Sequence, residues 1–125
     1  MRKAFGGGMR QAGVIAAASL YAFEHHIGRL AEDHERARGL AAGLTGAGYR
    51  VEPPETNIVL VRVEKPREFL QALAREGVLA TPGKVGHVRL CTHLDVCNVL
   101  RDPKPVIGAF VRVTRQLAGK PRAGV

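Results

Sequence analysis

The spacing of apolar residues predicts a long helix near the start of the chain. From Met9 to Leu30, apolar positions recur at alternating intervals of four and three residues, which is typical of one helical face. A second apolar surface, from Val14 to Ala22, lies on another side of the same helix. We therefore expect a helix from about Met9 to His26. Because a helix that is apolar nearly all round is normally buried, it should need a partner surface on more than one side.

A more polar helix is predicted to follow, with Gly28 as a break or kink between the two. Most of its charged residues lie off a single apolar stripe, and His34 falls close to that stripe. The stripe consists of Leu30, Ala37, Leu40, Ala41 and Leu44. The sequence Thr-Gly-Ala-Gly at 45–48 is typical of a helix end followed by a turn.

The second half of the chain alternates between strand and helix patterns. A β-branched run gives the clearest strand, and prolines or glycines mark most of the boundaries. The predicted strands are 49–51, 57–63, 78–80 and 87–91, with a turn at Pro82-Gly83. The predicted helices are 66–74, ended by Gly77, and 106–117 with Val106, Phe110 and Val113 on one face. This pattern indicates an α/β or α+β fold of two layers.

The composition excludes several classes of protein. A net charge of +8 would attract nucleic acid or acidic membranes without specificity. However, the basic residues are scattered and aromatic residues make up only 5%, so no specific nucleic-acid partner is expected. No apolar run reaches the length of a membrane span, and a charged start followed by glycines is not typical of a secretion signal. We expect a cytoplasmic protein without a membrane partner.

The cysteines and histidines predict neither a disulfide framework nor a metal site. Cys91 and Cys97 are the two cysteines, and in a cytosolic chain free thiols are expected. The histidines lack the spacing of metal ligands, since His25 and His26 are neighbours that point to different faces of a helix.

The glycine run 6–8 is a candidate anion-binding feature. It is preceded by Lys3 and followed by Arg10, at the start of the first predicted helix. Helix N-termini attract anions because their N–H groups lack partners and the helix dipole is positive there. A flexible turn before a buried helix is the alternative interpretation.

Blocks of the sequence resemble the threonine aldolases, which are pyridoxal-phosphate lyases of fold type I. The resemblance begins with the run RKAFGGGMRQAGVIAAA at 2–18 and continues through LYAFEHH at 20–26 and RLAEDH at 29–34. It returns at ETNIV, 55–59, and at VRLCTHLDV, 88–96, and it fades afterwards. The part of the family enzyme that these blocks match is the C-terminal part.

The resemblance implies a small C-terminal domain, in which a mostly antiparallel sheet carries helices on one face. On that basis we expect three regions. Residues 1–27 would be the motif and helix that link to a large cofactor-binding domain, 28–117 the small domain, and 118–125 a disordered tail. After Asp95-Val96 the sequence departs from the family pattern, and prolines 103 and 105 are expected to delay the closing helix.

The implied function is cleavage of β-hydroxy-α-amino acids such as threonine to glycine and an aldehyde, a reaction of amino-acid catabolism and glycine biosynthesis. Family members hold pyridoxal phosphate as a Schiff base with a lysine upstream of the glycine motif. Lys65, Lys84, Lys104 and Lys120 lack that context. Whether this chain is an enzyme therefore stays open, and we expect it to be inactive by itself, with no catalytic residue assigned.

Three residues are assigned roles by the resemblance. Arg89 matches the family arginine that binds the substrate carboxylate, and a guanidinium suits that task because it offers two parallel hydrogen bonds. The alternative is an ordinary exposed strand arginine. Lys3 and Arg10 match cations near the cofactor, on its phosphate side and in reach of a neighbouring subunit's site. For His93 a structural hydrogen bond or an exposed loop position is favoured over acid–base chemistry.

Two other interpretations remain open at this point. The chain could be a non-catalytic interaction module, because its apolar helix could dock onto full-length aldolase subunits and its basic surface onto acidic partners. It could also be a gene remnant without independent function. A homo-oligomer or an association with full-length subunits is the expected assembly.

Overall fold

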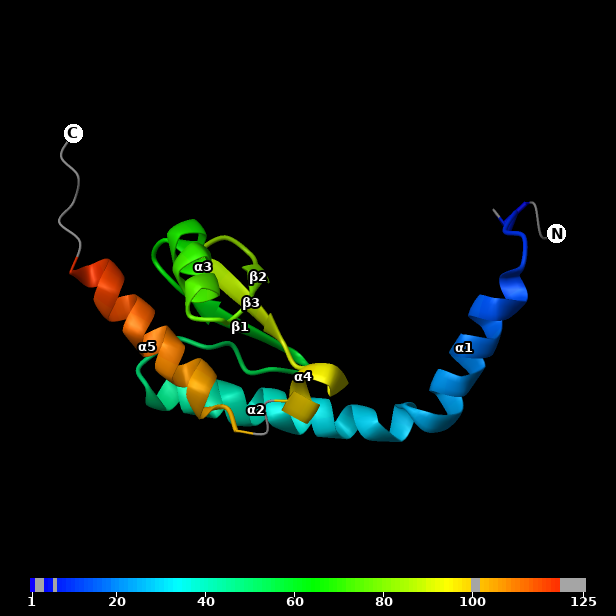
Figure 1. Cartoon of the computed structure of the whole chain (residues 1–125), viewed down its shortest axis with the longest axis horizontal. Helices are drawn as coiled ribbons and strands as arrows, with labels where there is room; N and C mark the ends of the chain where they lie inside the picture. Colours follow the sequence, from blue (N-terminus) through cyan, green and yellow to red (C-terminus); the bar gives the residue numbers. More distant parts are fainter. Residues whose placement is uncertain (2–3, 6, 100–101, 120–125) are drawn as a thin grey trace. The chain divides into compact units, whose positions relative to one another are not determined.

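A computed structural model describes residues 1, 4–5, 7–99 and 102–119 of the chain (Figure 1). The chain divides into two compact units, Met1–Ala31 and Glu32–Val125. Within the described residues no helix is both long and apolar enough to cross a membrane. Lys3 and the predicted tail from Lys120 onward lie outside the described residues.

The first unit is built around helix α1, Ala12–His25, followed by a short 3-10 helix η1, Ile27–Arg29. The break expected at Gly28 is therefore confirmed as a change of helix type. Gln11, directly before α1, has a φ of 51°, in the left-handed region that residues other than glycine rarely adopt. No residue of α1 is buried, although its sequence is strongly apolar.

The second unit contains helix α2 from Glu32 onward, helices α3, α4 and α5, and strands β1, β2 and β3. Their bounds are α2 Leu30–Gly46, β1 Ile58–Arg62, α3 Pro66–Arg75, β2 Thr81–Pro82, β3 His87–Cys91, α4 Leu94–Val99 and α5 Lys104–Ala118. The antiparallel sheet has the order β1-β3-β2. This arrangement confirms the predicted class, a small antiparallel sheet combined with helices.

Alternation along β1 and β3 gives the sheet one buried and one open face. Val59 pairs with Leu90 and Val61 with Val88, and all four side chains are buried. Beneath this face lie apolar residues from α2, α3 and α5, with Phe110 fully buried. Val106, Phe110 and Val113, which were predicted to share one face of α5, are all buried. In the strands, the positions between the buried residues form the open face of the sheet.

Two of the weaker strand predictions are wrong in place or extent. The segment 78–80 is not a strand, and the third strand is instead Thr81–Pro82, so the turn moves to 84–86 where Gly86 has a φ of 76°. The predicted edge strand 49–51 reduces to a single bridge between Val51 and Val61. Both segments are short, so their pairing depends on partners rather than on local pattern.

The region after β3 also differs from the prediction. Helix α4, Leu94–Val99, was not anticipated, and α5 begins at Lys104 rather than being delayed to Val106. Pro105 lies within the first turn of α5, where a missing N–H costs nothing. The Asp102 carboxylate accepts a hydrogen bond from the Lys104 N–H at 2.9 Å, which satisfies one of the first donors of the helix.

On α2 the apolar stripe is confirmed at four of its five positions. Ala37, Leu40, Ala41 and Leu44 are buried, whereas Leu30 is half exposed. Asp33, which was expected to lie off the stripe with the other charged residues, is instead 9% exposed.

Candidate functional site

Arg89 lies in the middle of β3, on the open face of the sheet. Its neighbours Val88 and Leu90 point into the core, so strand alternation places the Arg89 side chain on the exposed side. Across the sheet it is paired with Leu60 of β1 on one side and with Thr81 of β2 on the other. The arginine is therefore flanked by one apolar and one hydroxyl side chain.

A hydrogen bond joins Arg89 to Thr81. The Nε–H of Arg89 donates to the Thr81 hydroxyl oxygen, with 3.1 Å between the two heavy atoms. Among the described residues Arg89 makes no ion pair. A guanidinium carries five N–H donors, so this contact leaves four of them available to a ligand.

The carboxylate of Glu52 on the same face is engaged elsewhere. Val51 lies opposite Val61, so alternation puts Glu52 opposite Leu60, in the row that also contains Arg89. Its carboxylate accepts a hydrogen bond from the Lys84 ammonium and lies 3.3 Å from Nε2 of His87.

The Lys84 contact is the chief reason why the pKa of Glu52 falls below its ordinary value of 4.5. Electrostatic interactions with Lys84 and His87 add to this effect, whereas desolvation works against it. The Glu52 carboxylate is therefore ionised at neutral pH. Its partners are Lys84 and His87, and Arg89 is not among them.

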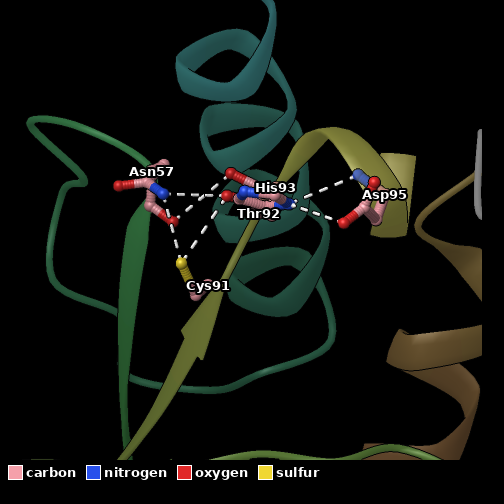
Figure 2. Close-up of polar contacts among 5 residues, drawn as sticks. All are labelled: Asn57, Cys91, Thr92, His93 and Asp95. Carbon is pink, nitrogen blue, oxygen red and sulfur yellow. Dashed lines mark hydrogen bonds and ion pairs between the residues drawn. The ribbon is translucent and has the colours of Figure 1, made fainter. Parts of the chain in front are cut away.

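The end of β3 is fixed by a clasp between Asn57 and Thr92 (Figure 2). The Thr92 N–H donates to the Asn57 carbonyl at 2.9 Å, and the Asn57 side-chain amide donates to the Thr92 carbonyl at 2.8 Å. The buried Thr92 hydroxyl also donates to the Asp33 carbonyl of α2 at 2.7 Å. Asn57 thus joins the start of β1 to the end of β3, which holds the strand that carries Arg89.

His93 and Cys91 flank this clasp without forming a catalytic pair. The Asp95 N–H donates to Nδ1 of His93 at 3.3 Å, so the imidazole caps the start of α4. This contact is a structural hydrogen bond of the kind expected for His93, whose side chain is 62% exposed. Cys91 is an exposed free thiol whose sulfur accepts a hydrogen bond from the Asn57 amide at 3.1 Å. Among the described residues no group of side chains could hold a metal ion.

Of the two predicted cofactor-contacting cations, only Arg10 is described. It belongs to the first unit, lies just before α1 and is exposed. A cation at this place fits a phosphate group chemically, as expected from the sequence. Lys3 lies outside the described residues, and Arg89 belongs to the second unit.

The described lysines do not fit the Schiff-base role of the expected cofactor. An amine that forms a Schiff base must lose its proton, which burial or a neighbouring cation promotes. Lys65, Lys84 and Lys104 instead pair with Glu68, Glu52 and Asp102, and their side chains are 62%, 56% and 86% exposed. These amines are held in solvent and against carboxylates, and none of the three is buried. The described residues therefore fit carboxylate and phosphate binding, but not covalent attachment.

Three features of the site were not anticipated from the sequence. The contact between Thr81 and Arg89 was not predicted because Thr81 lies between the predicted strand 78–80 and the predicted turn. The cluster of Glu52, Lys84 and His87 was not predicted because Glu52 is far from the other two in the chain. The sequence signal that could have indicated the strand of Thr81 was Pro82, because proline is tolerated in a short strand at the edge of a sheet. The Asn57–Thr92 clasp joins two sequence blocks that had been singled out separately, 55–59 and 88–96.

Comparison with known proteins adds a family and a set of relatives. The sequence model of the beta-eliminating lyases matches residues 1–66. The low specificity L-threonine aldolase of Escherichia coli is 42% identical over 97 residues, covering 76% of this chain and 28% of that protein. The probable low-specificity L-threonine aldolase 2 of Arabidopsis thaliana is 36% identical over 121 residues, covering 90% of this chain and 34% of that protein.

A solved structure shows a similar arrangement. A candidate aminotransferase from Burkholderia pseudomallei superposes with a TM-score of 0.54 at 25% sequence identity, over 78% of this chain and 29% of that one. The chain thus spans about a third or less of the length of the proteins that it matches.

Proposed function

Since the chain belongs to the beta-eliminating lyase family, we propose that it forms the small-domain part of a threonine-aldolase-like lyase. The reaction would be cleavage of a β-hydroxy-α-amino acid to glycine and an aldehyde. Two relatives whose names include threonine aldolase, at 42% and 36% identity, support this proposal. The observation that carries it is Arg89, a cation on an open sheet face without an ion pair among the described residues.

Arg89 would bind the α-carboxylate of the substrate. Two parallel N–H donors of a guanidinium match the two oxygens of a carboxylate, and the pairing fixes the orientation of the substrate as well as its affinity. The hydrogen bonds between Asn57 and Thr92 would keep β3 in register with β1, and so would fix the position of Arg89 along the sheet.

The cofactor in this proposal is pyridoxal phosphate. When bound, it supplies an electron-withdrawing ring that stabilises the carbanion left after the Cα–Cβ bond breaks. Arg10, and Lys3 beside the glycine run, would contribute positive charge to the phosphate side of the site. The contribution of this chain is thus binding and orientation, and no residue of it is assigned proton transfer.

A chimeric enzyme tests the proposal. Residues 1–125 replace the matching part of the Escherichia coli threonine aldolase, and acetaldehyde release from L-threonine is measured with pyridoxal phosphate present. We expect activity in the chimera, and Arg89→Gln should raise KM by roughly tenfold to a hundredfold through loss of a charge-assisted pair. Arg62→Gln removes an exposed arginine on a neighbouring strand and should change KM little. A soluble, cofactor-loaded chimera without activity would contradict the proposal.

A second candidate function rests on α1. A strongly apolar helix without a buried residue favours a role as an interaction surface. We propose that α1 mediates self-association, or association with longer subunits of the same family. This role is compatible with the first, because an enzyme small domain can also carry an assembly surface.

A further inference from the structure

A long, exposed side chain such as that of Arg89 has a fixed orientation only where a contact holds it. Arginine has several rotatable bonds, and ordering it on ligand binding costs up to about 2 kcal/mol of rotamer entropy. Arg89 is exposed on β3, yet its guanidinium is tied at one atom, Nε, to the Thr81 hydroxyl at 3.1 Å. We propose that Thr81 is a positioning residue that orients the Arg89 guanidinium for carboxylate binding, an inference that rests on the proposed function of Arg89.

The atom that Thr81 engages determines which edge of the guanidinium remains open. A guanidinium can meet a carboxylate through its Nε–Nη edge or through the edge formed by its two Nη atoms. Because the Nε–H is donated to Thr81, the first edge is occupied. A carboxylate therefore binds end-on, to the two Nη atoms, and its position relative to β3 is fixed.

The position of the Thr81 hydroxyl is itself well defined. Thr81 is the direct cross-strand partner of Arg89, so the two side chains leave neighbouring backbones in the same sheet. A β-branched side chain has few rotamers, and Pro82 restricts the backbone that follows. The pairing of β2 with β3 thus fixes both the Arg89 donor and the Thr81 acceptor.

Nothing among the described side chains competes for the open edge. The carboxylate in the same row, that of Glu52, is held by Lys84 and His87. The side chain between them, Leu60, carries no polar group. Thr81 therefore orients a guanidinium that has no counter-ion among the residues that the structure describes.

The test uses the full 125-residue chain labelled with ¹⁵N-arginine, followed by NMR during titration with acetate. Two readouts are recorded for Arg89: the exchange rate of its Nε–H with water, and the acetate dissociation constant from the shifts of its side-chain signals. The variants are Thr81→Val, which keeps the shape and removes the hydroxyl, and Thr81→Ser, which restores the hydroxyl. Thr45→Val, at an exposed position near the end of α2, is the matched control.

In Thr81→Val we expect faster exchange of the Arg89 Nε–H and a rise in the acetate dissociation constant of about threefold to tenfold. Thr81→Ser and Thr45→Val should stay within about twofold of the wild type, a difference that falls below roughly 0.4 kcal/mol. A merely structural role would not distinguish Val from Ser in this way.

Two outcomes overturn the inference and separate it from its premise. If wild-type Arg89 responds to acetate but Thr81→Val binds equally well, or Thr81→Ser binds as weakly as Thr81→Val, the positioning role is wrong and the function of Arg89 stands. If wild-type Arg89 shows no response to acetate, both the carboxylate role and the positioning role are overturned.

Discussion

The hydroxyl of Thr92, directly after β3, donates a hydrogen bond to the backbone carbonyl of Asp33 in α2 at 2.7 Å. The two residues are 59 positions apart in the chain, and Thr92 is only 7% exposed. This hydrogen bond links the end of the strand that carries Arg89 to helix α2. The same threonine takes part in the clasp with Asn57, so it fixes the strand end from two sides.

Thr92→Val should therefore destabilise the second unit. The substitution preserves the shape and leaves the Asp33 carbonyl without this donor, which costs about 1–3 kcal/mol in a buried site. Urea unfolding followed by far-ultraviolet circular dichroism measures the loss. Thr92→Ser should recover most of it, and Thr45→Val, on an exposed helix surface, should change the free energy of unfolding by less than about 0.5 kcal/mol. Equal stability of Thr92→Val and the wild type would show that the bond contributes nothing.

The parts of the fold that could be predicted from sequence are those with strong local patterns. Strand β3, His87–Cys91, has the predicted bounds because its alternating residues match a half-buried strand. Helix α3 begins at Pro66 and the chain turns at Gly77, whose φ of 79° only glycine adopts readily. These signals are contained within a few residues.

What could not be predicted depends on contacts between distant segments. Strand β2 exists because Thr81 and Pro82 pair with β3, whereas the more apolar 78–80 stays outside the sheet. The Arg89 assignment came from a family resemblance, and its open-face position from alternation, but its partner Thr81 required the register of the sheet. The Glu52 cluster joins residues more than 30 positions apart, which no local pattern reports.

The ion pair of Glu52 predicts a pH dependence of stability. Because Lys84 lowers the folded-state pKa of Glu52 below 4.5, this group stabilises the fold above its unfolded pKa. The contribution is lost as pH falls through the lowered folded value. Lys84→Met should therefore be less stable than the wild type at neutral pH, and the difference should shrink to nothing in acid. Thermal unfolding from neutral pH into acid measures it, and a difference that keeps its neutral-pH size after pH has fallen through the lowered pKa of Glu52 would contradict the assignment.

Releasing Glu52 should also impair Arg89. In Lys84→Met the carboxylate loses its main partner and can turn along its row toward the guanidinium. We expect the acetate dissociation constant at Arg89 to rise about twofold to fivefold, the range of an exposed ion pair. The double variant Glu52→Gln with Lys84→Met should restore wild-type binding, because the competing charge is gone. An unchanged constant in the single variant would show that Glu52 does not reach Arg89.

The 125-residue chain alone should form no specific Schiff base with pyridoxal phosphate. Its described lysines are exposed, and Lys65, Lys84 and Lys104 are paired with carboxylates. Borohydride reduction followed by peptide mass spectrometry should show only low labelling spread over several lysines, and no acetaldehyde should be released from L-threonine. Stoichiometric labelling of a single lysine would contradict this expectation. The chimeric enzyme, which contains the family's own lysine, is the positive control.

The exposed apolar surface of α1 predicts self-association. Val14, Leu20 and Phe23 are 75%, 62% and 66% exposed, and Glu24 is the only acidic or basic residue in the helix apart from the terminal His25. Covering these side chains with a partner would stabilise the complex by about 25 cal/mol for each Å² of apolar area removed from water. Sedimentation equilibrium of the 125-residue chain should therefore show reversible association at micromolar concentration.

Two charge insertions distinguish a specific surface from general stickiness. Phe23→Glu places a charge on the apolar stripe, where an interface would bury it, and should weaken association at least about tenfold. Ser19→Glu places the same charge on α1 outside both apolar surfaces and should weaken it much less. If both variants weaken association equally, net charge rather than a particular helix face controls it. If the wild type is a monomer in which α1 is still helical, α1 does not mediate self-association. The apolar surface of α1 would then have to be covered by a longer subunit, as the small-domain proposal implies.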